Sequence, residues 1–149
     1  MTSLKTLIAA LALATPLVVG VAPAAHAQEA FGDLTLSFPD LKAKTGQVMI
    51  AVYDSAQAWT SGKPVRAAAA SAADATPSAK IVALPPGTYA VRVFQDVDGD
   101  GKMGKNPFGM PTEPFGFSKD APVMMGPPAF DAAAFEVKAG ANVQVIHLN

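Results

Sequence analysis

The segment Lys80–Gln95 reads KIVALPPGTYAVRVFQ and gives the clearest indication of the fold. Its first residues form a short apolar run, and Pro85-Pro86-Gly87 then supplies residue types that are typical of turns. Thr88–Gln95 follows and is rich in β-branched and aromatic residues, which favour strands. The segment therefore predicts one short strand, a turn, and the strongest strand of the chain.

Further strands are predicted on both sides of this segment. The first follows from Leu34, Leu36 and Phe38, which alternate with polar residues as in a strand with one buried face. The others are Gln47–Tyr53, Ala133–Val137 and Val143–Leu148, the last two joined by a turn at 138–142. Such short strands, separated by Gly and Pro, predict an all-β fold: one antiparallel β-sandwich of about seven strands.

Two stretches lack a clear period. Between Trp59 and Ala79 the sequence is of low complexity, and we predict one weak strand near Val65 followed by a mobile loop. Residues 96–130 contain six prolines and six glycines, which makes regular structure improbable there. Burial of four phenylalanines is expected to hold this long loop in place: Phe108, Phe115, Phe117 and Phe130.

Residues 1–27 follow the secretory pattern: Lys5 near the start, an apolar run, and a small-residue end at Ala25-His26-Ala27. We therefore expect a cleaved signal peptide, export to the periplasm or beyond, and a mature single domain over residues 28–149. The chain has no cysteine, so neither a disulfide nor a lipid-anchoring thiol is expected. No later segment is apolar and long enough to predict a membrane span.

The charge balance argues against some partners. The chain has 11 basic and 12 acidic residues, and loss of Lys5 with the signal leaves 10 against 12. Without a basic patch, nucleic acid is not an expected partner, and an unidentified protein or glycan ligand remains.

Asp96, Asp98 and Asp100 alternate in the sequence DVDGDGK and predict a cation site. Ca²⁺ takes six to eight oxygen ligands, and alternating aspartates on a tightly turning backbone direct several carboxylates to one centre. Gly99 and Gly101 allow such a turn. The alternative is a solvated turn in which the carboxylates accept hydrogen bonds from backbone N–H groups.

Other residues are needed to complete such a site. The Lys102 carbonyl lies where similar loops donate a main-chain oxygen, but Pro107 occupies the position of the closing Glu of an EF-hand. By residue type, the remaining ligands are predicted among Asn106, Glu113 and Asp54. With so few charged ligands, we expect weak Ca²⁺ affinity, about 10⁻⁴ to 10⁻³ M.

Other chemistry is an alternative at several residues. A carbohydrate-active or other hydrolase would use Glu113 with an aspartate. A copper carrier would use the loop methionines, which are Met103, Met110, Met124 and Met125. His147 is the single histidine after residue 27 and is interpreted as an ordinary strand residue. Ser55 and Ser118 lack a nucleophile-elbow pattern, and Tyr53 and Trp59 are assigned to the core rather than to sugar stacking.

The motifs LPPGTYAVRVFQD, DVDGDGK, GMPTEPFGFS and GPPAFDAAAF resemble those of a family of exported bacterial proteins, the domain of unknown function 2141 family. The resemblance covers residues 47–148 and implies a small exported β-sandwich without an established activity. LPPGTYAV also looks like a strand of prealbumin-like and carboxypeptidase-regulatory-like sandwiches, a likeness of fold alone. Family members tend to carry an acidic or amide residue where this chain has Gly104, so one candidate ligand is absent.

Taken together, the sequence predicts an exported, non-enzymatic binding or structural module with no catalytic residues. A cation at the aspartates would order the long loop into a surface that a ligand or partner recognises.

Overall fold

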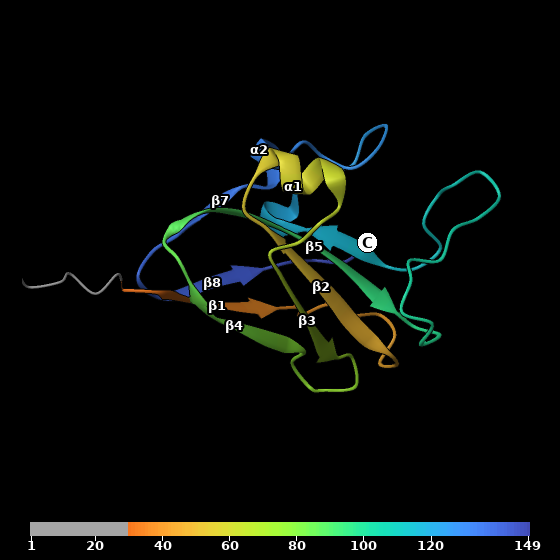
Figure 1. Ribbon diagram of the computed structural model, residues 1–149. Helices are drawn as coiled ribbons and strands as arrows, with labels where there is room; N and C mark the ends of the chain where they lie inside the picture. Colours follow the sequence, from red (N-terminus) through yellow and green to blue (C-terminus); the bar gives the residue numbers. More distant parts are fainter. Residues whose placement is uncertain (1–29) are drawn as a thin grey trace, which may run out of the picture.

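The computed structural model describes residues 30–149, and most of its regular structure consists of strands in two β-sheets (Figure 1). The predicted signal peptide, residues 1–27, lies outside the described residues. One sheet has the strand order β4-β1-β8, and the other has the order β3-β2-β5-β6, with β7 paired to β5. The all-β prediction is therefore confirmed. The strands are β1 Gly32–Ser37, β2 Gln47–Tyr53, β3 Arg66–Ser71, β4 Ser78–Leu84, β5 Gly87–Asp96, β6 Phe115–Phe117, β7 Phe135–Val137 and β8 Gly140–Val145.

The main core lies between the sheets. Along β5, Tyr89, Val91 and Val93 are buried and belong to this core, as the alternation in the sequence predicts. They pack with side chains from β1, β2 and β4 that are almost fully buried, among them Leu34, Leu36, Val48, Ile50, Val52 and Leu84. Full burial of one such side chain stabilises the fold by roughly 1.5–3 kcal/mol, so this layer is the main source of stability.

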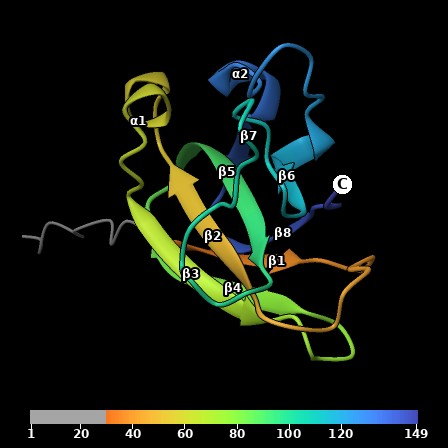
Figure 2. The same ribbon diagram turned by 90° about the vertical axis from the view of Figure 1, so that its right-hand side faces the viewer.

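A second, smaller core covers the outer face of the larger sheet. Tyr53 and Ala90 point to this face and pack beneath two short helices, α1 (Ala56–Ser61) and α2 (Phe130–Ala133). Both helices lie above the strands in Figures 1 and 2. Trp59 of α1 is buried against Tyr53 and Phe117, which confirms its assignment to the core. Within the described residues, no helix has the length and apolarity needed to cross a membrane.

One strand pair departs from the predicted antiparallel arrangement. β1 is parallel to β8, with Gly32 beside Gly140 and Ser37 beside Val145. β8 begins earlier than predicted and ends at Val145. Beyond it, the Ile146 N–H still donates to the Ser37 carbonyl of β1, and Asn149 exchanges two backbone hydrogen bonds with Phe115 of β6. Local alternation encodes which face of a strand is buried but not the direction of its neighbour, so no local pattern predicts this pairing.

For residues 59–79, the predicted weak strand near Val65 corresponds to β3, but the prediction was wrong in two other respects. A helix, α1, ends there: the Ser55 hydroxyl accepts a hydrogen bond from the Ala58 N–H at its start, and Gly62 adopts the left-handed conformation at its end. The alanine run forms β3 rather than a mobile loop, because it pairs with β2 along its whole length. Pairing with a strong strand overrides the weak β-propensity of alanine.

The segment 96–130 contains more regular structure than predicted. β6 lies within it and pairs with the middle of β5, and a 3₁₀ turn at Ser118–Asp120 follows directly. Phe117 is buried and Phe115 and Phe130 are half-buried, but Phe108 is 89% exposed, so the prediction that all four phenylalanines hold the loop in place was wrong for Phe108. The predicted strand 133–137 is shorter, because α2 occupies its start.

Candidate functional site

The aspartate-rich loop starts where β5 ends. Asp96 is the last residue of β5 and pairs with Gln47, at one end of the larger sheet. The loop projects beyond this end and returns at β6 (Figure 1). Asp54, a predicted candidate ligand, follows Tyr53, which pairs with Ala90 at the opposite end of the same strands. The structure therefore does not bring Asp54 to the loop.

Asp96 organises the first turn of the loop. The residue is almost fully buried, with 6% of its surface exposed. Oδ1 accepts hydrogen bonds from the N–H groups of Gly99 and Asp100, at 2.8 and 3.1 Å, and Oδ2 accepts one from Gly101 at 3.0 Å. Gly99 and Gly101 have φ values of 79° and 75°, so the predicted need for glycine in this turn is confirmed. These three amides lie beyond the end of the strand and have no carbonyl partner in the sheet, so the carboxylate accepts their hydrogen bonds instead.

Glu113 ties the return of the loop to its start. Its Oε1 accepts a hydrogen bond from the Val97 N–H at 2.8 Å, and its Oε2 accepts one from the Gly104 N–H at 2.9 Å. A Cβ atom at position 104 would lie 2.6 Å from the Thr112 hydroxyl oxygen. The close approach of the two loop arms therefore favours glycine here.

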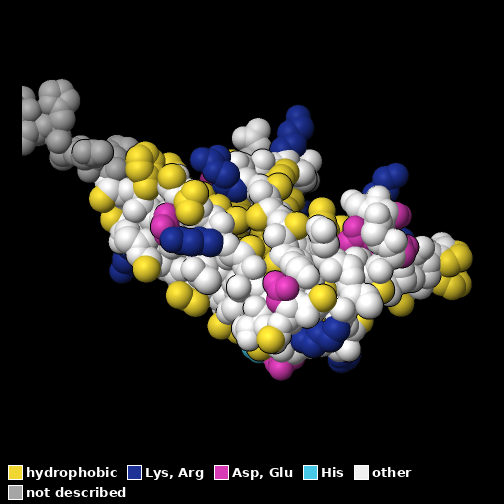
Figure 3. Space-filling model, turned by 90° about the horizontal axis from the view of Figure 1, so that it is seen from below, with side chains coloured by type: hydrophobic (Ala, Val, Ile, Leu, Met, Phe, Trp, Pro, Cys, Tyr) yellow, Lys and Arg dark blue, Asp and Glu magenta, His cyan; other side chains and the backbone are white. Residues whose placement is uncertain are grey.

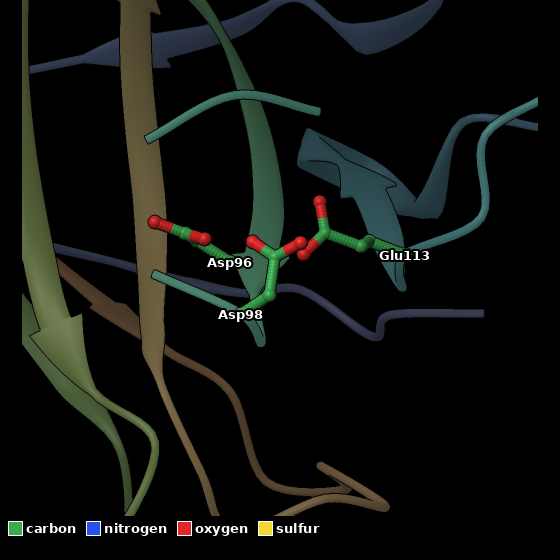
Figure 4. A group of neighbouring side chains, drawn as sticks. All are labelled: Asp96, Asp98 and Glu113. Carbon is green, nitrogen blue, oxygen red and sulfur yellow. The ribbon is translucent and has the colours of Figure 1, made fainter. Parts of the chain in front are cut away.

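Three of the predicted ligands converge at the base of the loop. Oxygen atoms of Asp96, Asp98 and Glu113 lie within 4.8 Å of one another. The carboxylates of Asp98 and Glu113 face each other beside Asp96 (Figure 4). Among the residues that the structure describes, none of the three forms a salt bridge with a lysine, arginine or histidine. The base of the loop thus concentrates negative charge without a neutralising side chain.

The other predicted ligands have different hydrogen bonds. Asp100 Oδ1 accepts a hydrogen bond from the Lys102 N–H at 2.7 Å, and Asp100 is not part of the three-carboxylate group. Asn106 Oδ1 accepts from the N–H groups of Phe108 and Met110, and so builds a turn farther along the loop. A role of the Lys102 carbonyl as a ligand stays a prediction.

Residues 105–111 form a small hairpin, which we call the loop tip. Lys105 and Pro111 pair across it, and the Asn106 carbonyl accepts a hydrogen bond from the Gly109 N–H to close the turn. The ordered turn presents Phe108, which is 89% exposed, and Met110 to solvent. The projecting end of the molecule carries acidic side chains near its base and hydrophobic ones at its extremity (Figure 3).

The alternative chemistries gain little support from the structure. Within the part of the chain that the structure describes, the residues that line two cavities beside the second core do not include Glu113. Ser118 is fully buried: its hydroxyl donates to the Ala133 carbonyl and accepts from the Val91 N–H, so it is held in a structural role. Met110 lies at the loop tip. Met124 and Met125 are exposed on a different loop, the one before α2, and Figure 1 shows these two loops apart from each other.

Two residues with distinctive contacts were not identified from the sequence. Arg92 lies on the outer face of β5 and lines the larger cavity, beside Trp59. The sequence pattern could have indicated it: in the most apolar strand, Arg92 is a charged residue on the face that alternates with the main-core face. Asp120 is the second, and it contacts His147.

Asp120 and His147 form an ion pair that closes the C-terminal segment against the 3₁₀ turn. The carboxylate accepts a hydrogen bond from the His147 N–H at 2.9 Å, and its Oδ2 lies 2.7 Å from the ring Nδ1. Asp40 Oδ2 is farther away, 3.5 Å from the ring Nε2. The hydrogen bond to Asp120, with the charge of that carboxylate, raises the pKa of His147 from its ordinary value of 6.5. Burial acts to raise the pKa of Asp120, but its hydrogen bonds to His147 outweigh this and lower it.

This pair predicts a dependence of stability on pH. Because the folded pKa of His147 is raised, its contribution is complete below about pH 6.5 and is lost as the pH rises through the folded pKa. The lowered pKa of Asp120 makes the contribution fall again below about pH 4. We expect the thermal midpoint to drop between about pH 6 and pH 8 more in the wild type than in His147→Gln. Parallel pH profiles of the two proteins would contradict this assignment.

Comparisons with known proteins address the chain as a whole. No curated protein and no solved structure matches it. The predicted likeness to prealbumin-like sandwiches therefore stays a prediction. A family model described as "Uncharacterized protein conserved in bacteria (DUF2141)" matches residues 37–145, which include β2 to β8 and the whole aspartate-rich loop. Since the match covers most of the chain and agrees with the motifs quoted above, the chain belongs to the DUF2141 family.

Proposed function

We propose that the protein is an exported, non-enzymatic binding module in which Ca²⁺ orders the loop between β5 and β6. The cation would bind at the three-carboxylate group of Asp96, Asp98 and Glu113. The ordered loop would then hold its tip, with Phe108 and Met110, in position for a partner, either a protein or a glycan.

The observation that carries this proposal is the convergence of carboxylates from both arms of the loop. Asp96 and Asp98 stand at its start and Glu113 near its end, yet their oxygens lie within 4.8 Å of one another. Each carboxylate oxygen has two lone pairs, so an oxygen that accepts a backbone hydrogen bond retains capacity for a cation. The oxygen-only set, with water in the remaining positions, suits Ca²⁺ and predicts weak binding.

The physical mechanism is electrostatic. Without a cation, the facing carboxylates of Asp98 and Glu113 repel each other, which opposes the hydrogen bonds by which Glu113 holds the two arms of the loop together. A divalent cation replaces this repulsion with attraction to both arms. Binding would therefore rigidify the loop while leaving the two sheets unchanged.

Thermal unfolding of residues 28–149 during a calcium titration tests the proposal. With a Kd of about 10⁻⁴ to 10⁻³ M, Ca²⁺ at about 10 mM should stabilise the fold by roughly 1.4–2.7 kcal/mol, which raises the thermal midpoint by several degrees. We expect Asp98→Asn to remove most of this rise, because Asp98 makes only one weak hydrogen bond within the loop, to Asp100, at 3.2 Å.

Asp74→Asn is the matched control, since Asp74 is an exposed aspartate in the turn between β3 and β4. Its calcium response should equal that of the wild type. Hydrogen exchange of the amides between residues 97 and 112 should slow in calcium only where Asp98 is intact. An equal rise in all three proteins, or none in the wild type, would exclude the carboxylate group as the site.

A further inference from the structure

A cavity of about 390 Å³ lies between the two helices and the outer face of β5. Its wall is mainly apolar, formed by Trp59 of α1, Phe130 of α2 and the two prolines at 127 and 128. The Trp59 indole N–H donates a hydrogen bond to the Pro128 carbonyl at 2.9 Å, which fixes the proline segment over the cavity. This site is separate from the aspartate-rich loop, so the inference below does not depend on the proposed calcium site.

Arg92 supplies the charge in this cavity. Its guanidinium carbon lies 3.9 Å from the centre of the Trp59 ring and 5.0 Å from that of Tyr53. Its Nη2 donates a hydrogen bond to the Trp59 carbonyl at 2.7 Å. Two aromatic rings and one carbonyl therefore hold the planar group in a fixed orientation.

The polar capacity of this guanidinium is only partly used. Its Nε is buried and has no hydrogen-bond partner. Among the described residues, no carboxylate forms a salt bridge with Arg92. Burial lowers the pKa of Arg92, since the charged form loses hydration there. A half-buried cation without a counter-ion is costly, and a bound anion would offset that cost.

We propose that this cavity binds a monocarboxylate with an apolar, ring-sized body. The carboxylate would accept charge-assisted hydrogen bonds from Arg92, and the body would pack against Trp59, Phe130 and the prolines. Asp131 also lines the cavity, and its negative charge disfavours a second negative charge on the ligand. A free small acid and the C-terminal carboxylate of a peptide share this chemistry.

Trp59 is the only tryptophan of the chain, so its fluorescence reports on the cavity directly. The first probe is benzoate, compared with benzyl alcohol, which keeps the ring without the charge, and with inorganic phosphate, which keeps the charge without the ring. We expect a saturable fluorescence change with benzoate at about millimolar affinity, and at least tenfold weaker binding of the other two. No saturable change with benzoate, or equal binding of benzyl alcohol, would overturn the proposal.

Three variants locate the effect. Arg92→Lys keeps a cation but loses the planar fork, so benzoate affinity should fall about tenfold. Arg66→Lys is the matched control at the other arginine of the chain, which is exposed on β3, and it should bind as the wild type does. Asp131→Asn should bind benzoate several times more tightly, because a repelling charge is removed. Unchanged affinity in both Arg92→Lys and Asp131→Asn would overturn the proposal. If Arg92→Lys does not fold, the affinity of Asp131→Asn and the comparison of benzoate with benzyl alcohol still test the proposal.

A second series distinguishes the two sources of the carboxylate. A tripeptide that ends in phenylalanine is compared with its C-terminal amide. Tighter binding of the acid tripeptide than of benzoate would identify a peptide C-terminus, and weaker binding would identify a free acid. Equal binding of acid and amide would contradict carboxylate recognition altogether.

Discussion

Gly46→Ala is expected to destabilise the protein by about 3–5 kcal/mol and to lower its thermal midpoint by roughly 10–20 °C. Gly46 precedes β2 and has a φ of 75°, where alanine is strained. In addition, a Cβ atom there would lie 1.9 Å from the Asp96 carbonyl oxygen and 3.0 Å from the Val97 Cα. The start of β2 and the end of β5 would have to move apart at the point where the aspartate-rich loop begins. Thermal and denaturant unfolding measure the change.

Gly62→Ala separates the two contributions to this effect. Gly62 has a similar φ of 69° at the end of α1, but a Cβ atom there meets no atom within 4 Å. This control should lose only about 1 kcal/mol, from the left-handed conformation alone. Equal losses in the two variants would show that the contact between Gly46 and Asp96 is not tight in solution.

The strands that could be predicted from the sequence are those with a strong local pattern of apolar residues. β2 was predicted with its observed bounds, and β4 and β5 to within two residues, because their apolar residues alternate and turn residues flank them. β3 was predicted only as a weak strand near Val65, and β6 was not predicted. Ala67 to Ala70 form a strand because β2 offers a pairing edge, and Phe115–Phe117 forms one because β5 does. Those partners are distant in sequence, so no local pattern encodes them.

The candidate site was predictable in composition more than in geometry. Alternating aspartates and the two glycines indicated the turn, and Asp96, Asp98 and Glu113 were among the predicted ligands. The hydrogen bonds that direct Asn106 to the loop tip and Asp100 to Lys102 depend on how the loop folds. Side chains that bond to nearby amides follow local backbone geometry, which residue type alone does not fix.

Phe108 shows the same limit for apolar residues. Because a phenylalanine side chain has a large apolar surface, its burial is expected to stabilise the fold, and Phe117 is indeed buried. Phe108 instead stands at a turn that Asn106 builds, so its exposure follows from the hairpin and not from its hydrophobicity. An ordered, exposed phenylalanine is consistent with a recognition role, and this is why the loop tip is part of the proposed function.

Asp96→Ala is expected to destabilise the protein by about 2–4 kcal/mol in EDTA, where no cation contributes. The substitution removes the acceptor for three backbone N–H groups, those of Gly99, Asp100 and Gly101, from a position that is 6% exposed. Hydrogen exchange should accelerate at these three amides first. Amides in the middle of β5, such as that of Val91, should change only as far as global stability does.

Two further variants establish what the Asp96 carboxylate does. Asp100→Ala removes one hydrogen bond from an exposed place in the same turn, so it should cost no more than about 1 kcal/mol. Asp96→Asn keeps one acceptor oxygen and loses the charge, so in EDTA it should fall between wild type and Asp96→Ala. The calcium response then separates the two functions of the residue: Asp96→Asn should retain much of the turn yet lose most of the calcium-dependent rise. If Asp96→Asn keeps the full rise, Asp96 acts only as a cap for backbone amides, and Asp98 and Glu113 would have to hold the cation without its charge.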